Sequence, residues 1–109
     1  MSLFAVNREA GPGWMDGTDA FDQPGAGDHA AFMNGLAEEG FILAAGPLAG
    51  TERGRIRVLL IADANNETEI VQRLANDPWE LTERMTTTTI EPWTLFVGTL
   101  SKPALEHRN

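Results

Sequence analysis

Residues 55–63 read Arg-Ile-Arg-Val-Leu-Leu-Ile-Ala-Asp, and this stretch decides the fold. Its middle, Val58 to Ile61, is apolar at every position, so both faces of an extended strand would be hydrophobic here. A strand of this kind lies inside a sheet with cover on both sides. We therefore expect residues 55–63 to form a central strand.

The chain before this strand predicts a strand, a long loop, a helix and a second strand. Residues 3–8 are a short apolar run of strand length. Residues 9–27 contain many glycines and predict a long surface loop, which is a common place for function in a compact domain. After the helix, residues 41–45 predict a buried strand that is ended by Gly46-Pro47.

The helix is predicted over residues 28–39 by a stripe with helical spacing. The residues of the stripe are His29, Phe32, Met33 and Leu36. Asp28 is a residue type that caps helix N-termini, and Gly40 is the glycine that commonly follows a helix. We expect the helix to lie between these two residues.

Beyond the central strand, the chain predicts two more helices and a last strand. A helix starts at Asn66, with Glu69 as its capping-box partner, and ends at Asn76-Asp77-Pro78. Asp77-Pro78 starts a short helix that runs to about residue 84. Residues 86–98 are rich in β-branched residues and predict the last strand, in which Pro92 indicates an edge position or a bulge.

This order is β-α-β-β-α-β within a single domain, with a core over residues 3–98 and a tail over 101–109. The fold class it predicts is α+β: a ferredoxin-like four-stranded antiparallel sheet with both helices on one face. Two helices cover only one face of a sheet whose strands are apolar on both faces. We expect a second copy of the chain to cover the other face, which makes the protein a homodimer.

The composition excludes most catalytic chemistries. The chain has no cysteine, a single lysine and two histidines, and its only serines are Ser2 and Ser101. Thiolate chemistry, serine hydrolysis, Schiff bases and histidine-built zinc sites are thereby excluded or disfavoured, and we expect no metal and no cofactor. What remains is acid–base chemistry by His, Asp or Glu, or no chemistry at all.

The charge balance excludes other classes of partner. Sixteen Asp and Glu against eight Lys and Arg give a net charge of −8. Because nucleic-acid binding requires a basic surface, we expect no nucleic-acid partner, and anionic membranes are disfavoured for the same reason. The chain starts without a signal-peptide pattern and has no apolar stretch of membrane-spanning length, so we expect a cytoplasmic protein.

Two residues are candidates for acid–base work. His29 lies in the first turn of its helix, where the helix dipole disfavours the imidazolium form, and a neutral imidazole is a usable general base. Alternatively, His29 only extends the apolar stripe. Asp77 has the position of a helix cap, but a capping carboxylate keeps a second oxygen that can orient a histidine. The two roles of Asp77 are compatible.

Aromatic and basic residues suggest where a ligand could bind. Trp79 and Trp93 could line one pocket, although tryptophan is more often a core or interface residue. Arg53, Arg55 and Arg57 cluster at the predicted hairpin, where they form either a solvated strand face or a site for an anionic ligand. Neither pattern is specific for one substrate.

Four features in this order resemble the YciI-like, or YCII-related, family across residues 3–98. They are His29 at the start of the first helix, Gly46-Pro47 after the second strand, Asp77-Pro78-Trp79 before the last strand, and Pro92-Trp93 within it. Where members often carry Arg-Pro before the helix histidine, this chain has Ala26-Gly27, and Trp79 stands where Tyr or Phe is commoner.

The resemblance implies a dimeric α+β barrel with a ligand pocket in each protomer and a His–Asp pair at its base. By position, the pair is His29 and Asp77, and the pocket includes Gly46, Pro47, Trp79 and Trp93. A relative acts as a dehydrochlorinase on a chlorinated hydroxyhydroquinone, which favours lyase-type proton abstraction from a small hydrophobic or aromatic molecule.

Two other functions stay open. The same pocket could serve a non-catalytic small-molecule-binding or accessory module. A haem-degrading or antibiotic-type monooxygenase shares the dimeric barrel, but only fold analogy supports that function.

Overall fold

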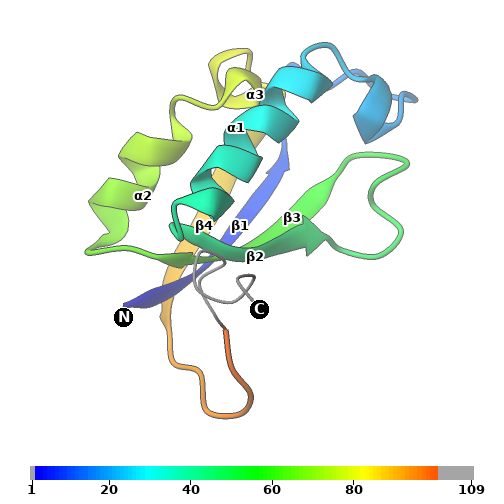
Figure 1. Ribbon diagram of the computed structural model, residues 1–109. Coiled ribbons are helices and arrows are strands. Elements are labelled where there is room, and N and C mark those ends of the chain that lie inside the picture. The colour runs from blue at the N-terminus through cyan, green and yellow to red at the C-terminus, as the bar shows by residue number, and fades with distance from the viewer. Residues whose placement is uncertain (1, 101–109) are drawn as a thin grey trace.

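The computed structural model describes residues 2–100 and contains a four-stranded antiparallel sheet (Figure 1). Its strands are β1 (Leu3–Ala10), β2 (Ile42–Pro47), β3 (Arg57–Asp63) and β4 (Met85–Trp93). They lie in the order β2-β3-β1-β4, and each neighbouring pair is antiparallel. With helices after β1 and β3, this is the ferredoxin-like arrangement, so the predicted α+β fold class is confirmed.

Two helices, α1 (Ala26–Glu38) and α2 (Glu67–Leu74), cover one face of this sheet (Figure 1). A four-residue helix, α3 (Pro78–Leu81), links α2 to β4. The main core lies between the helices and the sheet and consists of Phe4, Val6, Leu36, Phe41, Ile42, Leu60, Ala62, Ala64, Ile70 and Leu74. The predicted placement of both long helices on one face is therefore confirmed.

Strand β3 lies between β1 and β2, as its apolar middle predicts. Leu60 and Ala62 are fully buried in the core, whereas Leu59 points to the opposite face and is 39% exposed. Side chains alternate across a strand, so the apolar run supplies both faces of the sheet. Among residues 2–100, the helices cover one face of the sheet, and Leu59 on the other face stays partly exposed.

Helix α1 begins two residues earlier than the sequence predicts. Its N-cap is Gly25 in a left-handed conformation, without a side-chain cap, so the assignment of Asp28 as N-cap is wrong and Asp28 lies inside the first turn. The other end follows the prediction. The Gly40 amide donates to the carbonyl of Ala37 and the Phe41 amide to that of Leu36, a Schellman motif with Gly40 at positive φ.

Two strand ends also differ from the prediction. Gly46 and Pro47 are expected to follow β2, but in the structure they are the last two residues of the strand. Pro47 is tolerated because β2 is an edge strand and a proline there removes no ladder hydrogen bond on the open side. Strand β4 is also an edge strand, as Pro92 indicates, but it ends at Trp93 rather than at residue 98.

The loop over residues 11–25 is ordered by its own small core. It contains the 3-10 helix η1 (Ala20–Asp22), and the buried Trp14 and Ala20 pack with Ile56, Trp79 and Met85. The buried Gln23 amide side chain accepts from the Met15 amide and donates to the carbonyls of Met15 and Thr18. This loop is therefore packed against β4, α3 and the residue before β3.

The predicted tail over residues 101–109 lies outside the described residues. Within the described range, no helix has the length and apolar character needed to cross a membrane.

Candidate functional site

His29 and Asp77, 48 positions apart in sequence, are in direct contact. Nδ1 of His29 lies 2.9 Å from both Oδ1 and Oδ2 of Asp77. His29 is on the first turns of α1, and Asp77 is at the start of α3, so the packing of these two helices creates the contact. The expected distance between a carboxylate oxygen and a ring nitrogen is thus present, with Asp77 fully buried and the His29 side chain 16% exposed.

Asp77 is held by two further partners. As predicted for a helix cap, its Oδ1 accepts a hydrogen bond of 2.9 Å from the Trp79 amide. Its Oδ2 lies 2.9 Å from Nη2 of Arg8, which is only 1% exposed. A carboxylate with an amide, a guanidinium and an imidazole around it cannot rotate freely, so its orientation toward His29 is fixed.

Arg8 is the member of this cluster that the sequence analysis missed. Its Nη2 also lies 2.8 Å from Oε2 of Glu80, so one buried guanidinium connects two carboxylates. The signal was present in the alternation of β1, in which Phe4 and Val6 point into the core and Arg8 is the next residue on that face. Glu80, on the short helix predicted after Asp77-Pro78, uses its side chain to hold Arg8.

The surroundings of Asp77 keep it ionised. Burial raises the pKa of the Asp77 carboxyl, but the hydrogen bond from His29, the Trp79 amide and the positive charge of Arg8 outweigh burial and lower the pKa below 3.8. A carboxylate can only accept hydrogen bonds, so Nδ1 of His29 must carry the proton that it shares with Asp77. This leaves Nε2 as the ring nitrogen that is available to a ligand.

The lowered pKa of Asp77 predicts an acid-dependent loss of stability. A folded-state pKa below the unfolded value of about 3.9 adds stability that is fully present above that value. The added stability is lost as the pH falls through the folded-state pKa. Asp77→Asn lacks this charge at every pH, so the difference in unfolding free energy between wild type and variant should stay constant above about pH 5 and shrink as the pH falls below about 4. Urea titrations at a series of pH values measure it; a constant difference would contradict the prediction.

Trp79 forms a flat aromatic wall against His29. The two rings are stacked at 4.0 Å between centroids with an interplanar angle of 10°. The Trp79 indole N–H donates to the Pro24 carbonyl at 2.9 Å, and Trp14 packs edge-on against the same indole at 5.5 Å. His29 is therefore held both by its Nδ1 bond and by its ring face.

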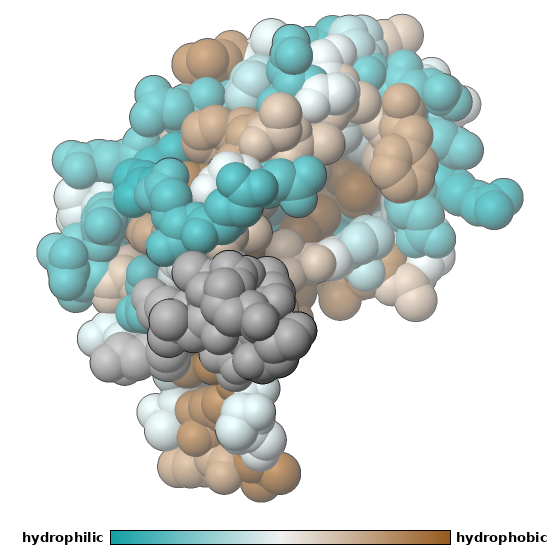
Figure 2. Space-filling model, in the orientation of Figure 1, coloured by the Kyte–Doolittle hydropathy of each residue, from teal (hydrophilic) through white to brown (hydrophobic). Residues whose placement is uncertain are grey.

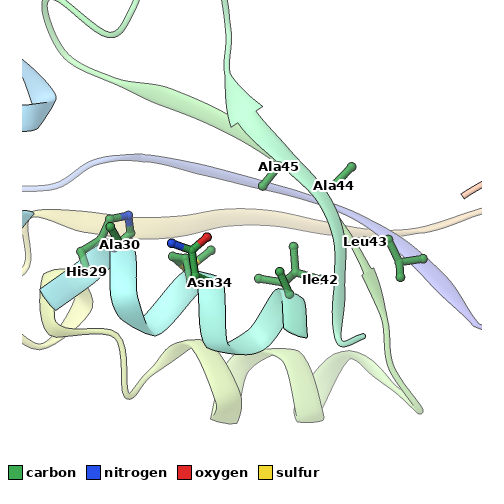
Figure 3. A pocket seen from close by; sticks show the side chains of 9 residues that line it. His29, Ala30, Asn34, Ile42, Leu43, Ala44 and Ala45 are labelled. Atoms are coloured by element: carbon green, nitrogen blue, oxygen red, sulfur yellow. The ribbon is translucent and has the colours of Figure 1, made fainter. Parts of the chain in front are cut away.

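Two adjoining cavities open beside His29. The first, of about 330 Å³, lies between α1 and β2, where His29, Ala30 and Asn34 face the strand residues Ile42 to Ala45 (Figure 3). The second, of about 240 Å³, shares His29 with it and extends to Trp79. Hydrophobic residues gather in the hollow between α1 and the β2–β3 hairpin (Figure 2). The second cavity is lined by Ala20, Phe21, Ala26, His29, Ala30, Met33, Ala45, Gly46, Pro47, Glu52, Ile56, Val58, Trp79 and Met85.

Three of the four residues expected at the ligand pocket line this second cavity, namely Gly46, Pro47 and Trp79. The expectation that Trp93 joins them does not hold within one chain. Met85, which lines the cavity, is the first residue of β4, and Trp93 is the last, opposite Leu3. At about 3.3 Å per residue, the two ends of this strand are more than 20 Å apart.

Among residues 2–100, no group of three or more histidine, aspartate and glutamate side chains is arranged to hold a metal ion.

Comparisons with known proteins find a likeness among solved structures. No protein-family model matches the chain, and no curated protein matches it. Among solved structures, it is similar to 5-chloro-2-hydroxyhydroquinone dehydrochlorinase from Burkholderia phenoliruptrix AC1100, solved in complex with 2,5-dihydroxybenzoquinone. The two are 25% identical with a TM-score of 0.63, covering 84% of this chain and 93% of the other. This likeness supports a YciI-like fold.

Proposed function

We propose that this protein is a small acid–base enzyme that removes a proton from a small, flat, mostly apolar molecule. His29 is the general base and Asp77 orients it. The observation that carries the proposal is the contact of Nδ1 of His29 with the buried Asp77 carboxylate, at the edge of an apolar cavity. A positioned histidine of this kind contributes roughly 10²–10⁴-fold to a proton-transfer step.

The mechanism follows from the proton on Nδ1. Because the Nδ1–H group donates to Asp77, the lone pair of the neutral ring is on Nε2. Nε2 therefore accepts the proton of the substrate. The imidazolium that forms is stabilised by the Asp77 carboxylate, which stays ionised because Arg8 lies beside it. The cavity is mainly apolar, so little water competes for the proton.

The cavity also indicates the kind of substrate. A volume of about 240 Å³ suits a single substituted ring, and the stacked Trp79 and His29 in the cavity lining offer aromatic contact. The similar dehydrochlorinase acts on 5-chloro-2-hydroxyhydroquinone. On a substrate of this class, the keto tautomer of the ring carries hydrogen and chlorine on the same carbon. His29 accepts the proton of the hydroxyl group conjugated with that carbon, the electron pair of the broken O–H bond forms the quinone carbonyl, and the shift of the double bond expels chloride. The ring loses HCl overall.

The proposal is tested by chloride release from 5-chloro-2-hydroxyhydroquinone. Wild-type protein should release chloride faster than the His29→Asn variant, which serves as the background because such rings also decompose without an enzyme. Equal rates would refute dehydrochlorination of this ring. If the ring still binds in the cavity, that result would favour the binding or accessory module.

We further propose that the protein is a homodimer joined through the open face of its sheet. Leu59 and Trp93 are exposed on that face by 39% and 38%, and a shallow hollow formed by β2 and β3 lies beside Leu59. A hydrophobic sheet face of this kind is normally covered. The dimer is also what the resemblance implies.

Light scattering tests the dimer. Wild-type protein should have twice the chain mass of 11.9 kDa at micromolar concentration. Leu59→Asp places a charge in the proposed interface and should give the monomer mass with an unchanged far-UV spectrum, since Leu59 is outside the main core. A wild-type mass equal to one chain would contradict the proposal.

A further inference from the structure

The lining of both cavities is nearly free of charge. Among the described residues that line the second cavity, only His29 and Glu52 are ionisable, and among those that line the first cavity only His29 is ionisable. Neither lining contains a lysine or an arginine from the described part of the chain. A charged ligand loses hydration on entering an apolar site and needs a partner of opposite charge there. Among the described lining residues, a negatively charged ligand finds no such partner.

The buried cation behind the dyad does not supply this partner. Arg8 lies within 2.9 Å of Asp77 and within 2.8 Å of Glu80, so its single positive charge faces two carboxylates. These three groups together carry a net charge of −1. With His29 neutral, as a general base must be, the back of the cavity is therefore negative.

The first turn of α1 also lies at the cavity, through Ala26. A helix N-terminus favours anions, but this one carries the carboxylate of Asp28 in the same turn. The carboxylate offsets the dipole, so the helix adds no strong anion site.

The arginines of the hairpin were candidates for a site that binds an anionic ligand, but they do not lie at the cavities. None of Arg53, Arg55 and Arg57 lines either cavity. Arg55 is held by Asp16 at 2.7 Å and donates to the carbonyls of Ala10 and Gly11. Arg57 lies on β3 opposite Glu9 of β1. Arg53 is exposed, and solvent-exposed charges are weakened by water and salt.

Glu52 is fixed at the edge of the second cavity. It belongs to the connection between β2 and β3, and its backbone carbonyl accepts a hydrogen bond of 3.2 Å from the Ala20 amide of η1. Both residues line the cavity, so this bond holds the Glu52 backbone at the cavity. Because the bond uses the backbone, the side chain can be replaced without breaking it.

We infer that the cavity selects uncharged hydroxylated rings and excludes their carboxylated analogues, with Glu52 as a residue that determines this specificity. The inference rests on the proposed function only in placing the ligand beside His29. An uncharged ring loses little hydration in the apolar walls and becomes an anion only when the imidazolium forms next to it. A carboxylated ring brings its charge before that cation exists, and it faces Glu52.

The test compares hydroquinone with 2,5-dihydroxybenzoate, which adds one carboxylate to the same ring and hydroxyl groups. Binding is followed by NMR titration at the Trp79 indole N–H and the Gly46 amide, both of which belong to the cavity lining. Wild-type protein should bind hydroquinone at least about tenfold more tightly than the benzoate, because Glu52 repels the benzoate carboxylate. Glu52→Gln should reduce this ratio, and Glu52→Lys should bring it close to one.

Glu38→Lys is the matched control, since it makes the same charge change at an exposed position of α1 outside both cavities. Its ratio should equal that of wild type. Three results would each overturn the inference: no binding of hydroquinone, equal or tighter wild-type binding of the benzoate, or a ratio that Glu52→Lys leaves unchanged. The measurement needs no turnover, so the expected ratios without any chloride release would refute the proposed catalysis and leave the inference in place.

Discussion

Asp77→Ala should destabilise the fold by about 3–5 kcal/mol, the usual effect of removing one partner from a buried ion pair. The variant loses the cap of α3, the contact with His29 and the carboxylate that faces Arg8. A missing cap alone costs about 0.5–2 kcal/mol. The larger part comes from Arg8, which is 1% exposed and would be left with Glu80 as its remaining carboxylate. Urea unfolding at neutral pH measures the change.

Asp16→Ala is the matched control for this experiment. Asp16 also forms an ion pair with an arginine, Arg55, at 2.7 Å, but both side chains are more than half exposed. Exposed pairs contribute about 0–1 kcal/mol, so this variant should unfold close to wild type. If the two alanine variants lost the same small amount of stability, Asp77 would be a simple helix cap and the buried network would contribute little.

The fold could be predicted from the sequence because its elements have strong local signals. The apolar run from Val58 to Ile61 fixed the central strand, and the Asn66 cap is present, with its side chain accepting from the Glu69 amide at 2.9 Å. Element ends were harder to predict. Gly25 caps α1 through a left-handed backbone conformation, and such a cap leaves no side-chain signal that could compete with Asp28. Pro47 stays in β2 because the strand is at an edge, which depends on the whole sheet.

The candidate site was predicted unevenly for a similar reason. The contact between His29 and Asp77 was expected only from the family resemblance, because nothing local joins residues on two different helices. Arg8 was missed because a charged residue at the end of an apolar strand is normally exposed. Its burial depends on Asp77 and Glu80, both more than 65 positions away, and no period-2 pattern reveals those partners. Trp93 lies away from the cavity of its own chain because β4 separates it from Met85, and the distance along β4 is a property of the folded strand.

Replacing His29 should have the largest effect on catalysis. His29→Asn removes the proposed base, so the turnover rate should fall by about 10²–10⁴-fold. Hydroquinone binding should change only a few-fold, because the cavity walls supply most of the contact. Asp77→Asn should also lower turnover, since an amide can donate to Nδ1 and so favour the neutral ring with its proton on Nε2. Nitrogen-15 shifts of the His29 ring report this exchange of tautomers directly, and a purely structural role of Asp77 would leave them unchanged.

Glu38→Gln is the control for the catalytic variants. Glu38 is an exposed residue of α1 that lines neither cavity, so its variant should keep wild-type turnover and the wild-type ring shifts. If His29→Asn retained turnover within about threefold of wild type, His29 would not be the base. If turnover fell but Asp77→Asn left the tautomer unchanged, His29 would act without orientation by Asp77. The buried Arg8–Asp77–Glu80 cluster would then serve the stability of the fold, and the apolar cavity would depend on His29 alone for its chemistry.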